Sequence, residues 1–241
     1  MRVRLLIPAC SSLILFAVAV ATPAARAQDI FVTPIPNVPF SAVVSVERSA
    51  TQPDGTNVSF HTVREIARDN HGRIHNEARV FEPASDSSIP AVVRVHLYDP
   101  QTRTNTMIVP MQRVYWTETL NHPPSTVPPS PRYGSGAQQG LPQNDFTQVE
   151  DLGVREFSGV SAHGYRETQT IPSENGEPET TVTDEYWYSD ELRINLMMKH
   201  SDPRKGTVTL TVSRINRTEP DPSAFEVPDG YKLATAVQRA N

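Results

Sequence analysis

The chain has 241 residues, a net charge of −5 at pH 7 and a hydrophobic share of 37%. This acidic balance, without any basic cluster, argues against nucleic-acid binding, which depends on Lys and Arg neutralising phosphates. The sequence contains 22 prolines, which are unfavourable inside helices. The hydrophobic share is large enough for a core and argues against a wholly disordered chain.

Residues 1–27 have the three parts of a cleavable signal peptide. Two arginines precede an apolar stretch at 13–20, and Ala25-Arg26-Ala27 places small residues where signal peptidase reads. The apolar stretch is shorter than the ~20 residues that span a bilayer, so cleavage is expected rather than anchoring. Cys10 is the single cysteine and would be lost with this segment. We therefore expect an exported protein, periplasmic or extracellular, with no disulfide and no membrane span after cleavage.

Alternation of apolar and polar side chains predicts β-strands over most of the remaining chain. In the first half the predicted strands are 41–47, 58–68, 73–81, 91–98, 104–109 and 112–117, the last two being two strands or one broken strand. In the second half they are 152–157, 160–171, 180–188, 192–199 and 207–213. No stretch has a sustained helical period. Residues 28–241 are therefore expected to form a single all-β domain, a large curved antiparallel sheet or open half-barrel with few helices.

The turn that ends at Gly72 allows two registers for its hairpin. If Arg68 pairs with Arg73, the side chains of Arg64 and Glu77 lie opposite each other, which is a favourable cross-strand pair. A bulged turn with Gly72 in the left-handed conformation shifts this register by one residue. The sequence leaves both registers open.

Two irregular segments complete the prediction. Residues 120–145 contain six prolines and three glycines without apolar periodicity, which is typical of a long loop. Near the end of the chain, Asp221 is expected to cap one helical turn, because a side-chain carboxylate there can accept backbone N–H groups.

Several short motifs carry a resemblance to known proteins. Glu185-Tyr186-Trp187-Tyr188-Ser189, Ser201-Asp202-Pro203-Arg204 and Glu219 to Pro228 resemble a group of exported, uncharacterised acidobacterial proteins. More remotely, the strand order and the Phe-x-x-Pro-x-Gly-Tyr stretch at 225–231 resemble the outer-membrane lipoprotein carrier (LolA-like) superfamily. That resemblance implies an open, half-rolled barrel that shelters acyl chains, and it implies no catalytic residues. Those carriers close the barrel with helices, whereas no stretch of this sequence has a sustained helical period.

Aromatic side chains are the candidate ligand-binding residues. On a strand, Tyr186 and Tyr188 point to one face and Trp187 to the other, and Tyr115 and Trp116 behave in the same way. One set is expected in the core, and the other can line a concave ligand surface. The full candidate set is Tyr186, Trp187, Tyr188, Tyr115, Trp116 and Met197.

Catalytic and metal motifs are weak. Ser161 and His163 lack the glycine that a nucleophile elbow requires two places after the serine. His61 and His75 are able to approach across the hairpin, with Glu65 or Glu77 as a third ligand, but solvated strand histidines are the expected outcome. We therefore expect no catalytic residue, no metal and no cofactor.

These observations predict a non-enzymatic exported module that binds an apolar ligand, such as a lipid or acyl chain, on the concave face of the sheet. One alternative is an envelope protein-interaction or structural module whose protein partner is unknown. A further alternative is a hydrolase whose site is assembled across strands.

Overall fold

The computed structural model describes residues 30–52, 54–84, 88–120, 146–173 and 179–235. The predicted signal peptide at 1–27 and all but the first residue of the predicted loop at 120–145 lie outside these ranges.

The described residues form one 13-stranded sheet and two short 3-10 helices. The strands are β1 (Phe40–Thr51), β2 (Asn57–Arg68), β3 (Ile74–Arg79), β4 (Glu82–Pro83), β5 (Val92–Asp99), β6 (Thr104–Val109), β7 (Val114–Thr119), β8 (Thr147–Phe157), β9 (Val160–Ile171), β10 (Thr180–Ser189), β11 (Ile194–Asp202), β12 (Gly206–Asn216) and β13 (Lys232–Leu233). The helices are η1 (Pro110–Gln112), which separates β6 from β7, and η3 (Pro222–Phe225).

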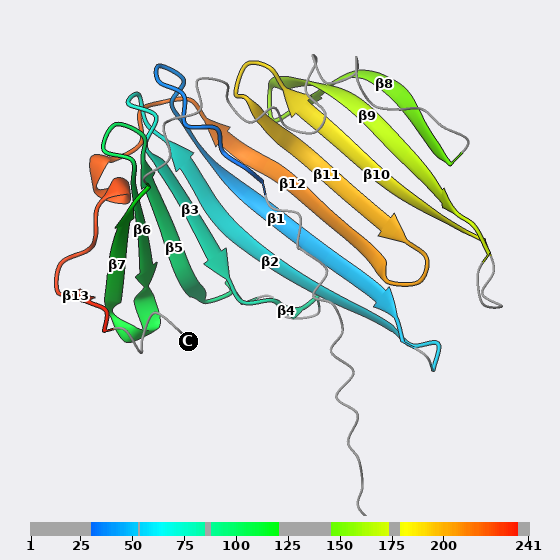
Figure 1. Cartoon of the computed structure of the whole chain (residues 1–241), viewed down its shortest axis with the longest axis horizontal. Coiled ribbons are helices and arrows are strands. Elements are labelled where there is room, and N and C mark those ends of the chain that lie inside the picture. The colour runs from blue at the N-terminus through cyan, green and yellow to red at the C-terminus, as the bar shows by residue number, and fades with distance from the viewer. Residues whose placement is uncertain (1–29, 53, 85–87, 121–145, 174–178, 236–241) are drawn as a thin grey trace, which may run out of the picture.

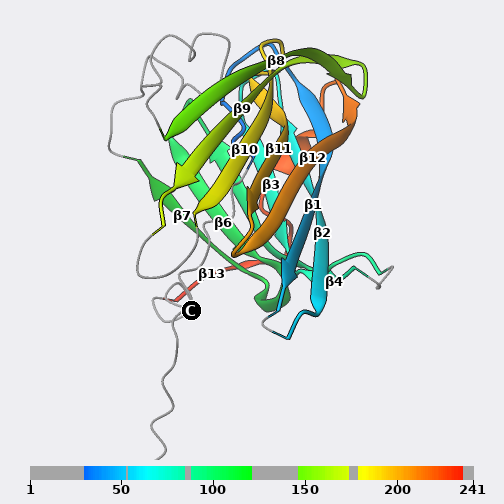
Figure 2. The same cartoon turned by 90° about the vertical axis from the view of Figure 1, so that its right-hand side faces the viewer.

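The strand order is β13-β7-β6-β5-β3-β2-β1-β12-β11-β10-β9-β8, with β4 pairing β2 beside this path. All neighbours pair antiparallel except β13 and β7, which are parallel. The two end strands, β13 and β8, do not pair with each other, so the sheet is open. Figures 1 and 2 show that it is strongly curved, with β6 and β7 facing β8 to β10 across a concave side. The predicted all-β, open half-barrel architecture is confirmed.

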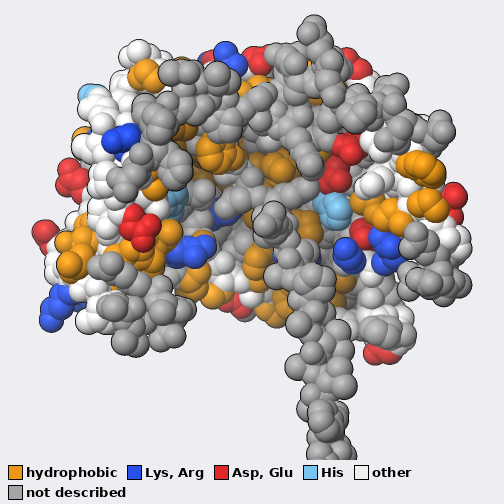
Figure 3. Space-filling model, viewed as in Figure 1, with side chains coloured by type: hydrophobic (Ala, Val, Ile, Leu, Met, Phe, Trp, Pro, Cys, Tyr) orange, Lys and Arg blue, Asp and Glu red, His pale blue; other side chains and the backbone are white. Residues whose placement is uncertain are grey.

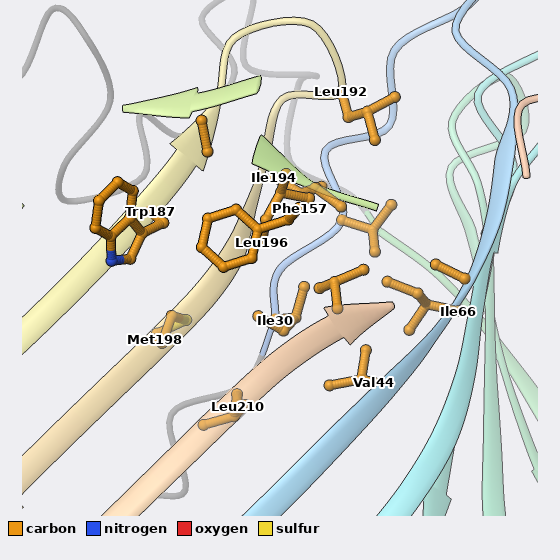
Figure 4. Packing of buried hydrophobic residues seen from close by; sticks show 14 of the residues in the cluster. Ile30, Val44, Ile66, Phe157, Trp187, Leu192, Ile194, Leu196, Met198 and Leu210 are labelled. Atoms are coloured by element: carbon orange, nitrogen blue, oxygen red, sulfur yellow. The ribbon is translucent and has the colours of Figure 1, made fainter. Parts of the chain in front are cut away.

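The larger part of the hydrophobic core lies on the concave face. Directly opposite residues in antiparallel strands share a face, and one such row runs Val46, Leu210, Met198, Tyr186 and Tyr165 across β1, β12, β11, β10 and β9. Figure 4 shows how several of the buried hydrophobic residues pack together. We call the buried concave side chains the packed floor: Phe40, Val44, Val46, Ile66, Tyr165, Tyr186, Ile194, Leu196, Met198, Leu210 and Val212.

An N-terminal strap, residues 30–39, crosses this concave side (Figure 1). Its Ile30 and Val32 are buried within the core cluster, whereas Phe31 between them is 59% exposed. This alternation places one side of the strap on the packed floor and turns the other outward. The strap therefore covers part of the floor that the sheet alone would leave open.

Arg68 at the end of β2 fastens the strap. Its guanidinium donates to the carbonyl oxygens of Thr33 at 2.7 Å, Val38 at 2.8 Å and Leu192 at 2.9 Å. It also lies 4.9 Å from the centroid of the Phe40 ring. Burial lowers the pKa of Arg68 to about 10, so the side chain is still charged at neutral pH. One buried cation thus joins the strap, β2 and the turn between β10 and β11.

The C-terminal segment covers the convex face of β3 to β7. The Phe225 ring centroid lies 5.0 Å from the Arg73 guanidinium, and the His75 ring is 2.7 Å from the Ala224 carbonyl oxygen. β13 then adds to the edge of the sheet beside β7.

The predicted cap of this segment is confirmed. The Asp221 carboxylate accepts the backbone N–H of Ser223 at 2.9 Å, where the 3-10 helix η3 begins.

The hairpin between β2 and β3 adopts the bulged register. Arg68 pairs with Ile74, and Gly72 has a φ of 81°. A side chain at Gly72 would also lie 3.2 Å from the strap backbone at Ile35, so the glycine serves both the turn and the close approach. In this register the Glu77 carboxylate instead accepts the backbone N–H of Glu65 at 3.3 Å.

Within the described ranges, neither helix has the length and hydropathy needed to cross a membrane.

Candidate functional site

The concave side chains of β3, β5, β6 and β7 continue the face of the packed floor. Ile66 pairs with Asn76, Asn76 with His96, His96 with Met107, and Met107 with Trp116. A parallel row on the same face runs through Tyr98, Asn105 and Glu118. We call this set the open wall: Asn76, His96, Tyr98, Asn105, Met107, Trp116 and Glu118.

The side chains of the open wall are accessible. Glu118 is exposed, and the other six residues are half-buried. The alternate side chains of the same strands, including Leu97 and Thr106, are buried on the other face, where Phe225 and Val227 line the same pocket. The convex side of these strands is therefore covered, and the concave side is the one that a ligand can reach.

Several polar groups on the open wall are uncommitted. The Oδ1 atom of Asn76 is buried and has no hydrogen-bond partner. Among the residues that the structure describes, neither the Tyr98 hydroxyl nor the Trp116 indole N–H is hydrogen-bonded either. His96 Nε2 contacts Asn105 Oδ1, which leaves the other ring nitrogen of His96 unused in this pair. A buried polar atom without a partner is unfavourable, so these groups favour a polar ligand atom.

Figure 3 shows the molecule from its concave side, which is hollowed. Hydrophobic side chains lie on the floor of the hollow, and Lys, Arg and His side chains lie beside them. The concave face thus combines an apolar floor with polar groups beside it.

The structure places the three predicted aromatic residues of β10 in the interior. Tyr186 belongs to the packed floor and is 5% exposed. Tyr188 is also buried, and burial raises its pKa above the ordinary 10.0 although Arg193 and Arg68 act in the opposite direction. The Tyr188 hydroxyl is therefore not ionised at neutral pH, and both rings act as core.

Trp187 and Met197 lie together on the other face of the sheet. They are directly opposite each other on β10 and β11, and Trp187 also pairs with Gly164 of β9. A side chain at Gly164 would meet the indole ring at 2.8 Å, so the glycine makes room for the ring. The Phe157 ring lies 5.7 Å from it, centroid to centroid. This pair is separate from the open wall.

A charged network borders Trp187. The indole N–H donates to Glu185 at 2.7 Å, and Arg166 donates to the same carboxylate at 3.1 Å. Burial would raise the pKa of Glu185, but these hydrogen bonds outweigh it and hold the pKa below the ordinary 4.5. The indole is thus fixed by a carboxylate that stays ionised.

Tyr115 and Trp116 face opposite sides of β7. Tyr115 pairs with Ile108 on the face that the C-terminal segment covers, while Trp116 pairs with Met107 on the open wall. Of the six predicted residues, Trp116 is the one that belongs to the accessible concave wall.

The remaining open-wall residues were missed by the sequence analysis. Asn76, His96, Asn105 and Met107 lie on predicted strands, so the alternation itself was available. Polar and apolar residues occur on both faces of those strands, because the convex face is buried by the distant C-terminal segment. The register with β2, not the local pattern, assigns these side chains to the hollow.

A serine-hydrolase geometry is not formed. His163 Nε2 lies 2.6 Å from Asp151 Oδ1, and the His163 ring stacks on Tyr165 at 4.6 Å. Within the described residues no hydrogen bond joins Ser161 to the His163 ring, so the nucleophile–base contact is missing.

One group in the described part of the chain has the spacing of a metal site, namely Asp69, His71 and Glu219. Both oxygens of Asp69 already accept hydrogen bonds, from the His71 and Arg73 backbones and from Arg73 Nε at 2.6 Å. Glu219 accepts the backbone N–H of Asn70. These contacts close the hairpin turn, and we assign the group to that structural role.

The proposed approach of His61 and His75 does not occur. His61 pairs with Glu82 of β4, whereas His75 pairs with Ala67 and contacts the carbonyl of Ala224.

Comparison with solved structures finds similar folds at low sequence identity. A chain of the MucA/MucB complex from Pseudomonas aeruginosa matches 83% of this chain with 9% identity and a TM-score of 0.41. This chain spans 59% of the length of that one. A LolA superfamily protein from Nitrosomonas europaea matches 80% of this chain and 91% of its own, with 10% identity and a TM-score of 0.31. LprF from Mycobacterium bovis matches 77% and 90%, with 16% identity and a TM-score of 0.28.

A LolA superfamily protein is thus among the similar structures, as the sequence resemblance led us to expect. No protein-family model and no curated protein sequence matches the chain.

Proposed function

We propose that this chain is an exported, non-enzymatic module that holds an apolar ligand, such as an acyl chain, in the hollow of its sheet. The observation that supports the proposal is the continuity of one concave face from the packed floor to the accessible open wall. The buried floor residue Ile66 pairs with Asn76, and the same row continues through His96 to the half-buried Met107 and Trp116. An apolar chain in this hollow would gain about 25 cal/mol for each Å² that it removes from water.

Export rests on the predicted signal peptide at 1–27. An exported carrier of this kind would meet its ligand at the cell envelope or outside the cell. Cleavage is checked by N-terminal sequencing of the protein recovered from the producing cell.

Binding is tested with the uncharged fluorophore N-phenylnaphthylamine. A charge on the open wall should oppose an apolar ligand, so Met107→Asp is expected to weaken dye binding by at least about tenfold. Met111→Asp is the matched control, because Met111 is 80% exposed and lies in η1, outside this row of strand residues. A wild-type protein that does not bind the dye, or equal binding by both variants, contradicts the proposal.

A further inference from the structure

The two sides of the hollow differ in chemistry. The packed floor is almost wholly apolar, whereas the open wall carries two carboxamides, an imidazole, a phenol, an indole and a carboxylate in two adjacent rows. We propose that the ligand is an amphiphile whose uncharged, hydroxyl-bearing head group binds the open wall through Asn76, Tyr98 and Trp116. This inference rests on the proposed function and adds the class of the ligand.

Asn76 selects the type of head group. Its carboxamide has one acceptor and one donor end and no side-chain hydrogen bond in the described part of the chain, and the acceptor atom is buried. A hydroxyl group both donates and accepts, so it satisfies either end of the carboxamide. A carboxylate only accepts, and a quaternary ammonium does neither. The carboxamide therefore favours hydroxyls over both kinds of charged head group.

Charged side chains also lie on this face of the sheet. Arg94 is exposed on this face, since it pairs with Ala78 two residues beyond Asn76, and Glu118 is exposed at the other end. These opposite charges flank the row of His96, Met107 and Trp116 on its two sides. Arg64, opposite Val44 of the packed floor, and Lys232, opposite Val114, add further cations to this face, so the head group is selected by the hydrogen-bonding groups rather than by charge.

The aromatic side chains provide the apolar part of the contact. Trp116 and Tyr98 are half-buried, and each combines a flat apolar ring with an uncommitted polar hydrogen. Sugar and glycerol groups have the complementary pattern, with C–H faces and a rim of hydroxyls. The wall thus offers both ring surface and hydrogen bonds to one head group.

The test compares three amphiphiles with the same dodecyl tail, namely dodecyl maltoside, dodecanoate and dodecyltrimethylammonium. Each displaces N-phenylnaphthylamine from the full chain below the concentration at which it forms micelles. Dodecyl maltoside is expected to bind about tenfold more tightly than either charged amphiphile. Two additional hydrogen bonds would provide a difference in binding free energy of this order.

Two variants locate this preference. Asn76→Leu is expected to remove most of it while leaving the affinity for dodecanoate within about twofold. Asn195→Leu is the control, because Asn195 also has a buried Oδ1 atom without a partner but lies on β11, away from the open wall. Tyr98→Phe removes a single hydroxyl without a change of shape, and it is expected to reduce the preference about threefold even if Asn76→Leu fails to fold.

Equal affinity for the three amphiphiles, or a preference that survives both Asn76→Leu and Tyr98→Phe, overturns the head-group assignment alone. Failure of the wild-type protein to bind the dye and all three amphiphiles overturns the proposed function, and this inference with it.

Discussion

The packed floor and the open wall belong to one face of one sheet, yet they differ in how deeply their side chains are buried. On the floor, Leu196 and Val44 are fully buried, while on the wall Met107 and Trp116 remain half-buried. Both regions are built from strands with a two-residue alternation. The difference comes from what lies over them, because the strap inserts Ile30 and Val32 onto the floor. Burial of a sheet face is therefore decided by its cover as much as by its own side chains.

The two regions also differ on their convex side. Behind the wall, Leu97 and Ile108 are buried, where the C-terminal segment with Phe225 covers this part of the sheet. Behind the floor, β1 and β12 present small hydroxyl side chains, among them Ser45 and Thr209, around a shallow groove of about 510 Å³. The wall is thus supported from behind and free in front, an arrangement that suits a binding surface.

The largest expected effect tests this contrast directly. Leu196→Ala should lower the free energy of unfolding by about 3 kcal/mol, because it opens a cavity in the floor. Met107→Ala on the wall should cost under about 1 kcal/mol, since that side chain is half-exposed. Urea denaturation of both variants measures the difference, and similar costs for the two would show that the wall is also packed.

An intermediate effect is expected at Gly164. An alanine there would place its Cβ 2.8 Å from the Trp187 ring, and the overpacking should cost about 2 kcal/mol. The chain has two tryptophans, so a Trp116→Phe background isolates the fluorescence of Trp187, which should change. Adding Trp187→Leu to Gly164→Ala should remove most of the penalty. If Gly164→Ala costs as much stability in the Trp187→Leu background, contact with the indole ring is not the cause of the loss.

The fold was largely predictable, because the pattern that indicates a strand lies within a short stretch of sequence. Period-two alternation in β1, β11 and β12 follows from one buried and one exposed face, so a short window of sequence contains the signal. The cap at Asp221 was predictable in the same way, because Asx capping involves only neighbouring residues. The hairpin register was narrowed to two choices, and the close approach of Gly72 to the strap selects between them.

The site was less predictable, because its residues are chosen by distant contacts. Trp116 was named from its residue type, but Asn76 and Met107 acquire their role only through pairing across four strands. In β10, Tyr186 and Trp187 are buried on opposite faces, since Gly164 on the neighbouring strand accommodates the indole. A single sequence does not reveal that a glycine 23 residues away creates this space.

The smallest expected effect concerns the pH dependence at Glu185. Its pKa is depressed in the folded protein, so its contribution to stability is complete above the unfolded pKa and is lost as the pH falls through the folded value. Glu185→Gln should therefore reduce the loss of stability between about pH 6 and pH 3. Urea midpoints at several pH values measure it.

Glu156→Gln is the control for this measurement, because Glu156 is exposed on β8, and it should retain the wild-type dependence. A Glu185→Gln variant with an unchanged pH profile would exclude the network around Trp187 as a source of acid sensitivity.

The contacts of Arg68 have a consequence for the order of folding. Its three carbonyl acceptors are separated from it by 30, 35 and 124 residues along the chain. We therefore expect the strap to dock once β2 has met the turn between β10 and β11, because both supply groups to the same set of hydrogen bonds. Resistance of the strap to a protease then reports that assembly is complete, and the N-terminus becomes the last segment to gain protection during refolding.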